Sequence, residues 1–334
     1  MIRRRLFAQG LVASSLGVTT ALRAQEFPNR PLRLVVGLAP GGIADITARI
    51  VAPRLGEVLG QSVVVENRTG AGGAIATRFV AGSAADGYTL LVAFDGTHVT
   101  IPASNPQAGF DPLVDFAPIG KMVDSPVLVT AHPSFPASNF AEFMQLSRRM
   151  ITGNEGVRVF DYGTAGVGST GHLTMELLKL RLGFYALHIP YRGGGDARAQ
   201  VLGRQIPLML AAVPTTSNDI RNGMLKGLAV TSAKRSPVLP NVPTLAEIGH
   251  RELKGLDVNS WVGLVAPAKT PSPVVARLDA ALKQVLAMDD IHARLTNAGA
   301  TPVKSSPEIF TRQISADLDQ WKKVIAESRL RLEA

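Results

Sequence analysis

The sequence predicts an α/β protein made of two lobes with a ligand cleft between them. Three observations predict it: short β-branched runs alternate with longer helical patterns, glycine-rich loops follow several expected strands, and two Pro/Ser-rich stretches interrupt the chain. The alternation is typical of parallel sheets covered by helices. With 334 residues, 46% of them apolar, the chain is long enough for two ordinary domains, each with its own core.

The expected elements follow from β-branched composition and from the spacing of apolar residues. A helix is expected over Ile43–Leu59, with a kink or a break at Pro53. Further helices are expected over Pro273–Met288 and from about Pro307 to Leu330. The expected strands, in chain order, are Arg33–Gly37, Val63–Val65, Thr89–Ala93, Val127–Thr130, Val159–Tyr162, Leu187–Ile189, Pro207–Leu210, Leu228–Val230 and Val262–Val265.

The two Pro/Ser-rich stretches are expected where the chain passes between the lobes. They lie at Ser125-Pro126 and from Ser236 to Pro243. In this interpretation the second lobe, residues 125–244, is inserted in the first. The first lobe then comprises residues 25–124 and 245–334, and both ends of the mature chain belong to it.

The first 24 residues are expected to be a secretory signal peptide. Arginines at positions 3–5 form a positive start, Leu11–Leu22 is a weakly apolar stretch, and Ala24 is a small residue suited to cleavage. No later segment reaches the ~18 consecutive apolar residues of a membrane span. The Arg pair also fits a twin-arginine signal, so the Sec and twin-arginine routes both stay open. We therefore expect an exported, soluble protein.

Charge and composition exclude several classes of function. The formal net charge is +9. Residues 1–24 hold four arginines and no acid, which leaves 31 basic and 26 acidic residues, or +5, in the mature chain. No Lys/Arg stripe interleaved with aromatic residues indicates nucleic-acid binding, and a mild positive field attracts small anions. The absence of cysteine excludes thiolate catalysis and zinc–thiolate sites.

The most informative segment is the loop from Ala39 to Asp45, between the first strand and the first helix. Gly41 and Gly42 let the backbone approach a ligand closely. A helix N-terminus offers unpaired N–H groups and a positive dipole end, and ligands of α/β sheets bind outside the carboxyl ends of strands. The loop therefore predicts a carboxylate or phosphate site, unless it is only a tight turn. Asp45 either orients the loop or accepts a hydrogen bond from the ligand.

Three more glycine-rich loops follow expected strands, at Thr69–Gly73, Gly163–Thr170 and Tyr191–Gly195. Any one of them fits a simple turn. Four such loops, divided between two lobes, predict a cleft lined by backbone donors. The hydroxyls of Thr164, Ser169 and Thr170 can donate to a carboxylate without adding charge.

Two enzymatic alternatives use the same part of the chain. The segment Gly166-x-Gly168-x-x-Gly171 fits the dinucleotide fingerprint, which would make the protein an NADP-dependent oxidoreductase. The fingerprint expects an acidic residue about 20 residues on, where His188 stands, although Arg192 could bind a 2′-phosphate instead. A hydrolase is disfavoured because Ser169 lacks the glycine that a nucleophile elbow requires two residues before it.

Motifs along essentially the whole mature chain resemble the tripartite tricarboxylate transporter substrate-binding proteins, the Bug family of extracytoplasmic receptors. The matching segments are Pro40–Arg49, Val64–Gly73, Tyr162–Leu173, His188–Gly194, Ala229–Thr244 and Trp261–Pro267. Two departures stand out. Leu38 occupies a position where an aromatic residue is common, and Ala268-Lys269-Thr270 replaces the usual Ala-Gly-Thr.

The resemblance implies a Venus-flytrap protein of the periplasmic-binding-protein type. It would capture a small carboxylate or related solute in the periplasm and deliver it to a two-subunit integral-membrane permease. We expect a monomer with no catalysis, cofactor, metal or nucleic-acid partner, and the identity of the ligand stays open. The positions that match the family's ligand contacts are Pro40, Gly41, Gly42, Asp45, Gly72, Gly73, His98, Thr164, Ala165, Ser169, Thr170 and Tyr191.

Overall fold

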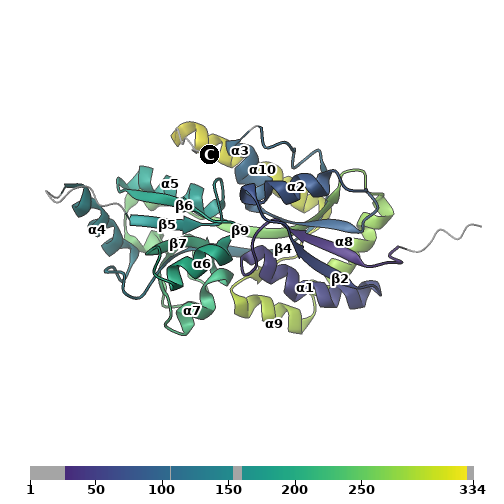
Figure 1. Cartoon of the computed structure of the whole chain (residues 1–334), viewed down its shortest axis with the longest axis horizontal. Coiled ribbons are helices and arrows are strands. Elements are labelled where there is room, and N and C mark those ends of the chain that lie inside the picture. Colours follow the sequence, from purple (N-terminus) through teal and green to yellow (C-terminus); the bar gives the residue numbers. More distant parts are fainter. Residues whose placement is uncertain (1–26, 106, 153–159, 329–334) are drawn as a thin grey trace, which may run out of the picture.

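The computed structural model shows two α/β lobes side by side (Figure 1). It describes residues 27–105, 107–152 and 160–328. The expected signal peptide, residues 1–24, lies outside the described residues.

A single long strand, β4 (Phe116–Ala131), runs through both lobes. Its first part pairs with β9 (Asn259–Pro267) in the first lobe. From Val127 onward it pairs with β7 (Leu208–Ala212) and β8 (Lys226–Val230) in the second lobe. In Figure 1, β4 and β9 lie across the middle of the molecule, so the lobes are joined through the sheet itself.

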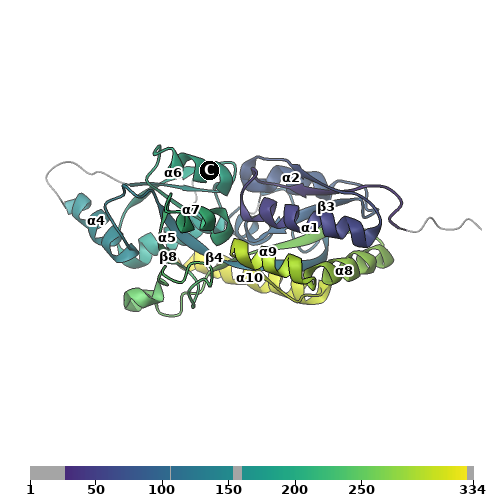
Figure 2. The same ribbon diagram turned by 90° about the horizontal axis from the view of Figure 1, so that it is seen from below.

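The sheet of the first lobe has the order β2-β1-β3-β9-β4. Strands β1, β2 and β3 are parallel, and β9 is antiparallel to both of its neighbours. One face packs on α1, α8 and α9, which Figure 2 shows side by side, and the other packs on α2 and α10. The remaining bounds here are β1 Leu32–Val36, β2 Val63–Asn67, β3 Thr89–Phe94, β10 Thr301–Pro302, α1 Ile43–Leu59, α2 Ala74–Ala81, α3 Ile101–Ser104, α8 Ser272–Leu286, α9 Asp289–Ala298 and α10 Pro307–Ser328.

The second lobe continues the sheet in the order β4-β7-β5-β6, with β8 on the other side of β4. Strands β5, β6 and β7 are parallel, whereas β4 is antiparallel to β7 and β8. Apolar clusters lie on both faces of this sheet as well. The bounds are β5 Phe160–Thr164, β6 Ala186–Pro190, α4 Phe140–Thr152, α5 Thr170–Leu182, α6 Gly194–Leu202 and α7 Ser217–Arg221.

Two sequence-based expectations about the elements need correction. The sheets are mixed, not parallel, because β4 and β9 run against their neighbours. Pro53 does not break α1, which is one continuous helix. A proline removes one N–H and its hydrogen bond, and the buried apolar face of this helix outweighs that loss.

The inserted lobe ends later in the chain than expected. Leu245, Leu253 and Leu256 pack into the core of the second lobe, and β9 then begins to pair with β4 at Asn259. We therefore place the end of this lobe near Val258 instead of at residue 244.

Candidate functional site

The loops at the carboxyl ends of the strands of both lobes meet around a small cavity of about 50 Å³. Its lining combines backbone, hydroxyl and apolar groups that are far apart in the sequence. The first lobe contributes Leu38, Gly42, Ile43, Phe94, Asp95 and Ser260. The second lobe contributes, among others, Ala165, Ser169, Thr170, Gly194 and Thr215.

Three helices, α1, α5 and α6, begin at this cavity. Their first residues, Ile43, Thr170 and Gly194, all line it. A helix N-terminus carries N–H groups without intrahelical partners and the positive end of the helix dipole. Three such termini from two lobes therefore converge on one space, which suits an anionic group.

The lobes touch directly through their glycine loops. The Ala39 N–H donates to the Arg192 carbonyl across the cleft at 3.0 Å. Beside this bond the backbones are so close that a Cβ on Gly195 would lie 1.9 Å from the Pro40 carbonyl oxygen. A Cβ on Gly193 would lie 2.7 Å from the Ala39 nitrogen. Only glycine permits this approach, so the structure shows a closed arrangement of the lobes.

Asp45 orients the first glycine loop from within the protein. Its carboxylate accepts hydrogen bonds from the Gly41 N–H at 3.0 Å, the Arg49 Nε at 2.9 Å and the Asn67 Nδ2 at 3.0 Å. Asn67 also donates to the Leu38 carbonyl at 3.0 Å. Asp45 is buried and does not line the cavity, which favours the loop-orienting interpretation over direct ligand contact.

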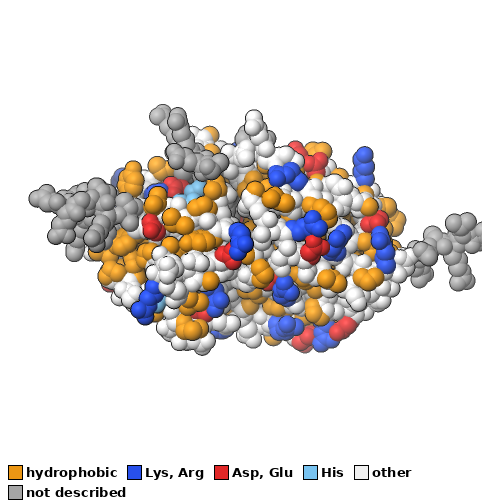
Figure 3. Space-filling view, in the orientation of Figure 1, with side chains coloured by type: hydrophobic (Ala, Val, Ile, Leu, Met, Phe, Trp, Pro, Cys, Tyr) orange, Lys and Arg blue, Asp and Glu red, His pale blue; other side chains and the backbone are white. Residues whose placement is uncertain are grey.

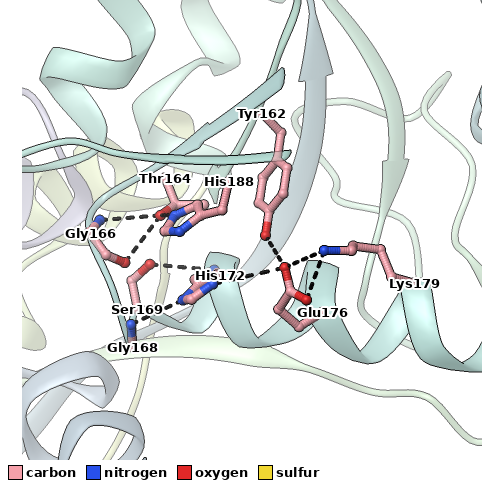
Figure 4. A network of polar contacts seen from close by, with 9 residues as sticks. All are labelled: Tyr162, Thr164, Gly166, Gly168, Ser169, His172, Glu176, Lys179 and His188. Carbon is pink, nitrogen blue, oxygen red and sulfur yellow. Dashed lines mark hydrogen bonds and ion pairs between the residues drawn. The ribbon is translucent and has the colours of Figure 1, made fainter. Parts of the chain in front are cut away.

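A polar network fixes the loop between β5 and α5 (Figure 4). Thr164 Oγ1 accepts from the Gly166 N–H at 3.2 Å and lies 2.7 Å from His188 Nε2. The Gly168 N–H donates to His172 Nδ1 at 3.1 Å. The two imidazole rings stack with centroids 3.7 Å apart. The loop is therefore held in shape by side chains behind it.

Both imidazoles in this network are neutral at pH 7. Burial lowers the pKa of His172 to about 4 and that of His188 to about 3. His172 accepts at Nδ1 from a backbone N–H, so its ring proton is on Nε2. Neither ring adds a positive charge beside the cavity.

Asp95 is a site residue that the sequence analysis did not identify. It directly follows β3, is 4% exposed, and lines the cavity. Its carboxylate accepts from Ser260 Oγ at 2.6 Å and from Thr170 Oγ1 of the opposite lobe. Burial raises its pKa to about 6. Its position at the carboxyl end of a strand was the available signal, but its partners are 75 and 165 residues away.

Comparison with known proteins decides the family. The chain matches the tripartite tricarboxylate transporter family receptor over residues 47–330. Protein BugT of Bordetella pertussis is 32% identical over 332 residues, which cover 99% of each chain. This chain belongs to that receptor family.

Solved structures of similar proteins share the receptor's fold. The periplasmic binding protein BugD is 35% identical with a TM-score of 0.83, covering 90% of this chain and 98% of its own. MatC of Rhodopseudomonas palustris, solved with bound malate, is 32% identical with a TM-score of 0.83, covering 90% and 100%. Another R. palustris protein, solved with adipate, is 33% identical with a TM-score of 0.84, covering 91% and 98%. The expected periplasmic-binding-protein type of α/β fold is confirmed.

The predicted ligand residues of the receptor fall into four groups. Four of them line the cavity: Gly42, Ala165, Ser169 and Thr170. Pro40 and Gly41 lie at the lobe contact against Gly195. Gly72 and Tyr191 line a wider groove of about 930 Å³ between the lobes.

The other predicted residues support loops or fill the core. Asp45 and Thr164 hold the two loops described above, and Gly73 is buried against Gly37. His98 is fully buried on the turn after β3, with its ring 4.9 Å from that of Phe116, and does not line the cavity. Burial lowers its pKa to about 3, so it is a neutral core residue.

The dinucleotide alternative gains no support from the position of its glycines in the receptor. A Cβ on Gly166 would lie 3.2 Å from the Tyr191 carbonyl oxygen and 3.4 Å from the Gly72 Cα, and one on Gly168 would lie 3.1 Å from Ile101. Protein atoms, including those of the first lobe, thus closely approach both glycines. Arg192, the candidate for a 2′-phosphate, is paired with Asp196 at 2.8 Å.

Within the part of the receptor that the structure describes, no group of His, Asp and Glu is arranged to hold a metal ion. None of the described helices combines the length and the apolar composition of a membrane span. On the face shown in Figure 3, Lys and Arg are interspersed with Asp and Glu and form no continuous stripe.

Proposed function

We propose that this receptor captures a small organic carboxylate, or a related solute, by closing its lobes around the cavity at the three helix N-termini. It works in the periplasm as a non-catalytic monomer and delivers the closed complex to a two-subunit membrane permease. The observation that carries the proposal is the convergence of Ile43, Thr170 and Gly194, the first residues of three helices from both lobes, on one buried space. The relatives solved with malate and adipate support the ligand class.

The chemistry of the lining suits reversible capture of an anion. Its donors are backbone N–H groups and the hydroxyls of Ser169 and Thr215, all of them neutral. Closure excludes water, which strengthens each N–H···O contact in the low local dielectric. Neutral donors leave no unpaired cation behind when the ligand departs.

A thermal-shift screen of the mature protein against small organic acids tests the proposal. A ligand that binds only the folded state raises the melting temperature as its concentration rises, by about 2.7 kcal/mol of stabilisation at 100 times its Kd. We expect at least one acid to do so at micromolar concentration. If no carboxylate shifts the transition at millimolar concentration, the proposed ligand class is wrong.

Gly42→Val tests the location of the site. Gly42 has φ −85° and ψ 170°, a conformation that valine adopts readily, so the fold should be retained. Its added side chain points toward the opposite lobe, where the Gly194 nitrogen lies 3.7 Å from an ideal Cβ. We expect calorimetry to show at least a 100-fold loss of affinity, with a smaller loss for Gly42→Ala. Unchanged affinity in the valine variant would rule out this cavity.

A further inference from the structure

Among the described residues that line the cavity, Asp95 is the only one with a charged side chain. Its three donors in the described part of the chain are the hydroxyls of Ser260 and Thr170 and, at 3.4 Å, the Trp261 N–H, and all of them are neutral. No Lys, Arg or His forms an ion pair with it among the described residues. A carboxylate that is 4% exposed therefore lies at the ligand cavity without a compensating cation.

A buried carboxylate without a cation is costly, because hydroxyl donors replace only part of the lost hydration. Burial raises the pKa of Asp95 to about 6, which leaves the group mostly ionised at pH 7.5. The charge of another acid, Asp317 on α10, adds repulsion. A cation can lower this cost from the cavity, which Asp95 lines. Asp95 also borders a second space of about 400 Å³, lined by Asp124, Asp257 and Asp317, whose described lining contains no helix N-terminus for a ligand carboxylate.

The acidic group lies directly beside the anion-binding end of a helix. Thr170, whose hydroxyl donates to Asp95, is also the first residue of α5. A site for positive charge and a site for negative charge are thus separated by a single side chain. An α-amino acid carries its ammonium and carboxylate groups on one carbon, so it can place one group at each site.

We propose that Asp95 is a specificity-determining residue that selects α-amino acids over carboxylates without an amine. This inference rests on the proposed function and adds the ammonium group of the ligand to it. The ligand carboxylate binds the helix N-termini, and its ammonium donates to Asp95. Leu38, Phe94 and Leu210, which also line the cavity, contact the carbon atoms of the ligand.

The test compares ligands that differ only in the amino group. The matched pairs are L-alanine and propionate, L-aspartate and succinate, L-glutamate and glutarate, and L-phenylalanine and 3-phenylpropionate. The affinities are measured by calorimetry with wild-type protein at pH 7.5. In each pair with measurable binding, we expect the amine to raise the affinity about 10-fold to 100-fold, because a charge-assisted hydrogen bond contributes that much. Malate against succinate tests the charge: a hydroxyl that raises affinity as much as the amine overturns the inference.

Asp95→Asn removes the charge and keeps the shape. We expect it to abolish the preference for the amine, because affinity for the amino acid falls while affinity for the acid without an amine stays equal or rises. Asp317→Asn is the matched control: it removes a partly buried acid that does not line the cavity, so the preference should remain. A preference that survives in Asp95→Asn overturns the inference, as does its absence in the wild type.

The two proposals fail in different ways. Tight binding of succinate or glutarate with no gain from the amine leaves the proposed function standing and overturns only the role of Asp95. Failure of every acid and amino acid to bind overturns both. If circular dichroism shows that Asp95→Asn is misfolded, the comparison of matched pairs with the wild-type protein still decides the question.

Discussion

Asp45 and His172 illustrate how single residues prepare the site on opposite lobes. Asp45 accepts from the Gly41 N–H, and His172 accepts from the Gly168 N–H. Each side chain thereby fixes a glycine loop that would otherwise be flexible, and neither lines the cavity. The loops are therefore already ordered in the folded protein. Ligand binding then carries no entropic cost of ordering them, which favours affinity.

Asp95 predicts a pH-dependent stability. Burial raises its pKa from 3.8 to about 6, so the folded protein binds this proton more tightly than the unfolded chain. The stabilisation is fully present below about pH 4 and is lost as the pH rises through 6, by about 3 kcal/mol at most. Ser260, Trp261 and Thr170 do not titrate, and Asp317 repels the charge.

We therefore expect Asp95→Asn to raise the free energy of unfolding at pH 7.5 and to leave it nearly unchanged at pH 4. Urea denaturation of both proteins at the two pH values measures the difference. An equal effect at both pH values would show that Asp95 does not titrate between them, and the pKa argument would be wrong.

At the scale of elements, local signals in the sequence identify some parts and miss others. Helix α1 has the predicted bounds, Ile43–Leu59, because apolar spacing and flanking glycines mark it locally. The first half of β4 was missed, because Pro118, Gly120 and charged residues interrupt it and its pairing shifts register twice. The glycine loops of the candidate site were visible as motifs. Asp95 was not, because its partners Thr170 and Ser260 are 75 and 165 residues away in the sequence, and Thr170 belongs to the other lobe.

Gly195, in the first turn of α6, predicts a way to prevent closure without unfolding either lobe. The three atoms nearest to an ideal Cβ there belong to Pro40 and Gly41 on the opposite lobe, and the shortest distance is 1.9 Å. Within its own helix, alanine is favoured over glycine. We expect Gly195→Ala to keep or raise thermal stability and to lower ligand affinity at least 10-fold, measured by calorimetry.

Gly82→Ala is the matched control for this substitution. Gly82 ends α2, and an ideal Cβ there is 3.6 Å or more from other atoms, none of them in the second lobe. It should bind ligand like the wild type. Normal affinity in Gly195→Ala would mean that the bound form is less closed than this structure.

At the scale of the whole molecule, closure should be visible at one backbone amide. The Ala39 N–H donates to the Arg192 carbonyl on the other lobe, so this bond exists only while the lobes are together. We expect saturating ligand to slow hydrogen exchange at Ala39, with little change at core amides of β3. Mass spectrometry of peptides from both regions makes the comparison, and equal exchange at Ala39 with and without ligand would argue against closure on binding.

The step in β4 where the chain passes between the sheets has a consequence for rate. Pro126 has no N–H to give to the ladder, and the Val127 N–H donates to the Thr231 hydroxyl at 3.1 Å. The joint therefore has fewer main-chain donors than an uninterrupted strand. We expect rotation there to fall in the microsecond-to-millisecond range of hinge motions. A stiffer joint would open and close more slowly, which would limit how often one receptor molecule could capture and release a ligand.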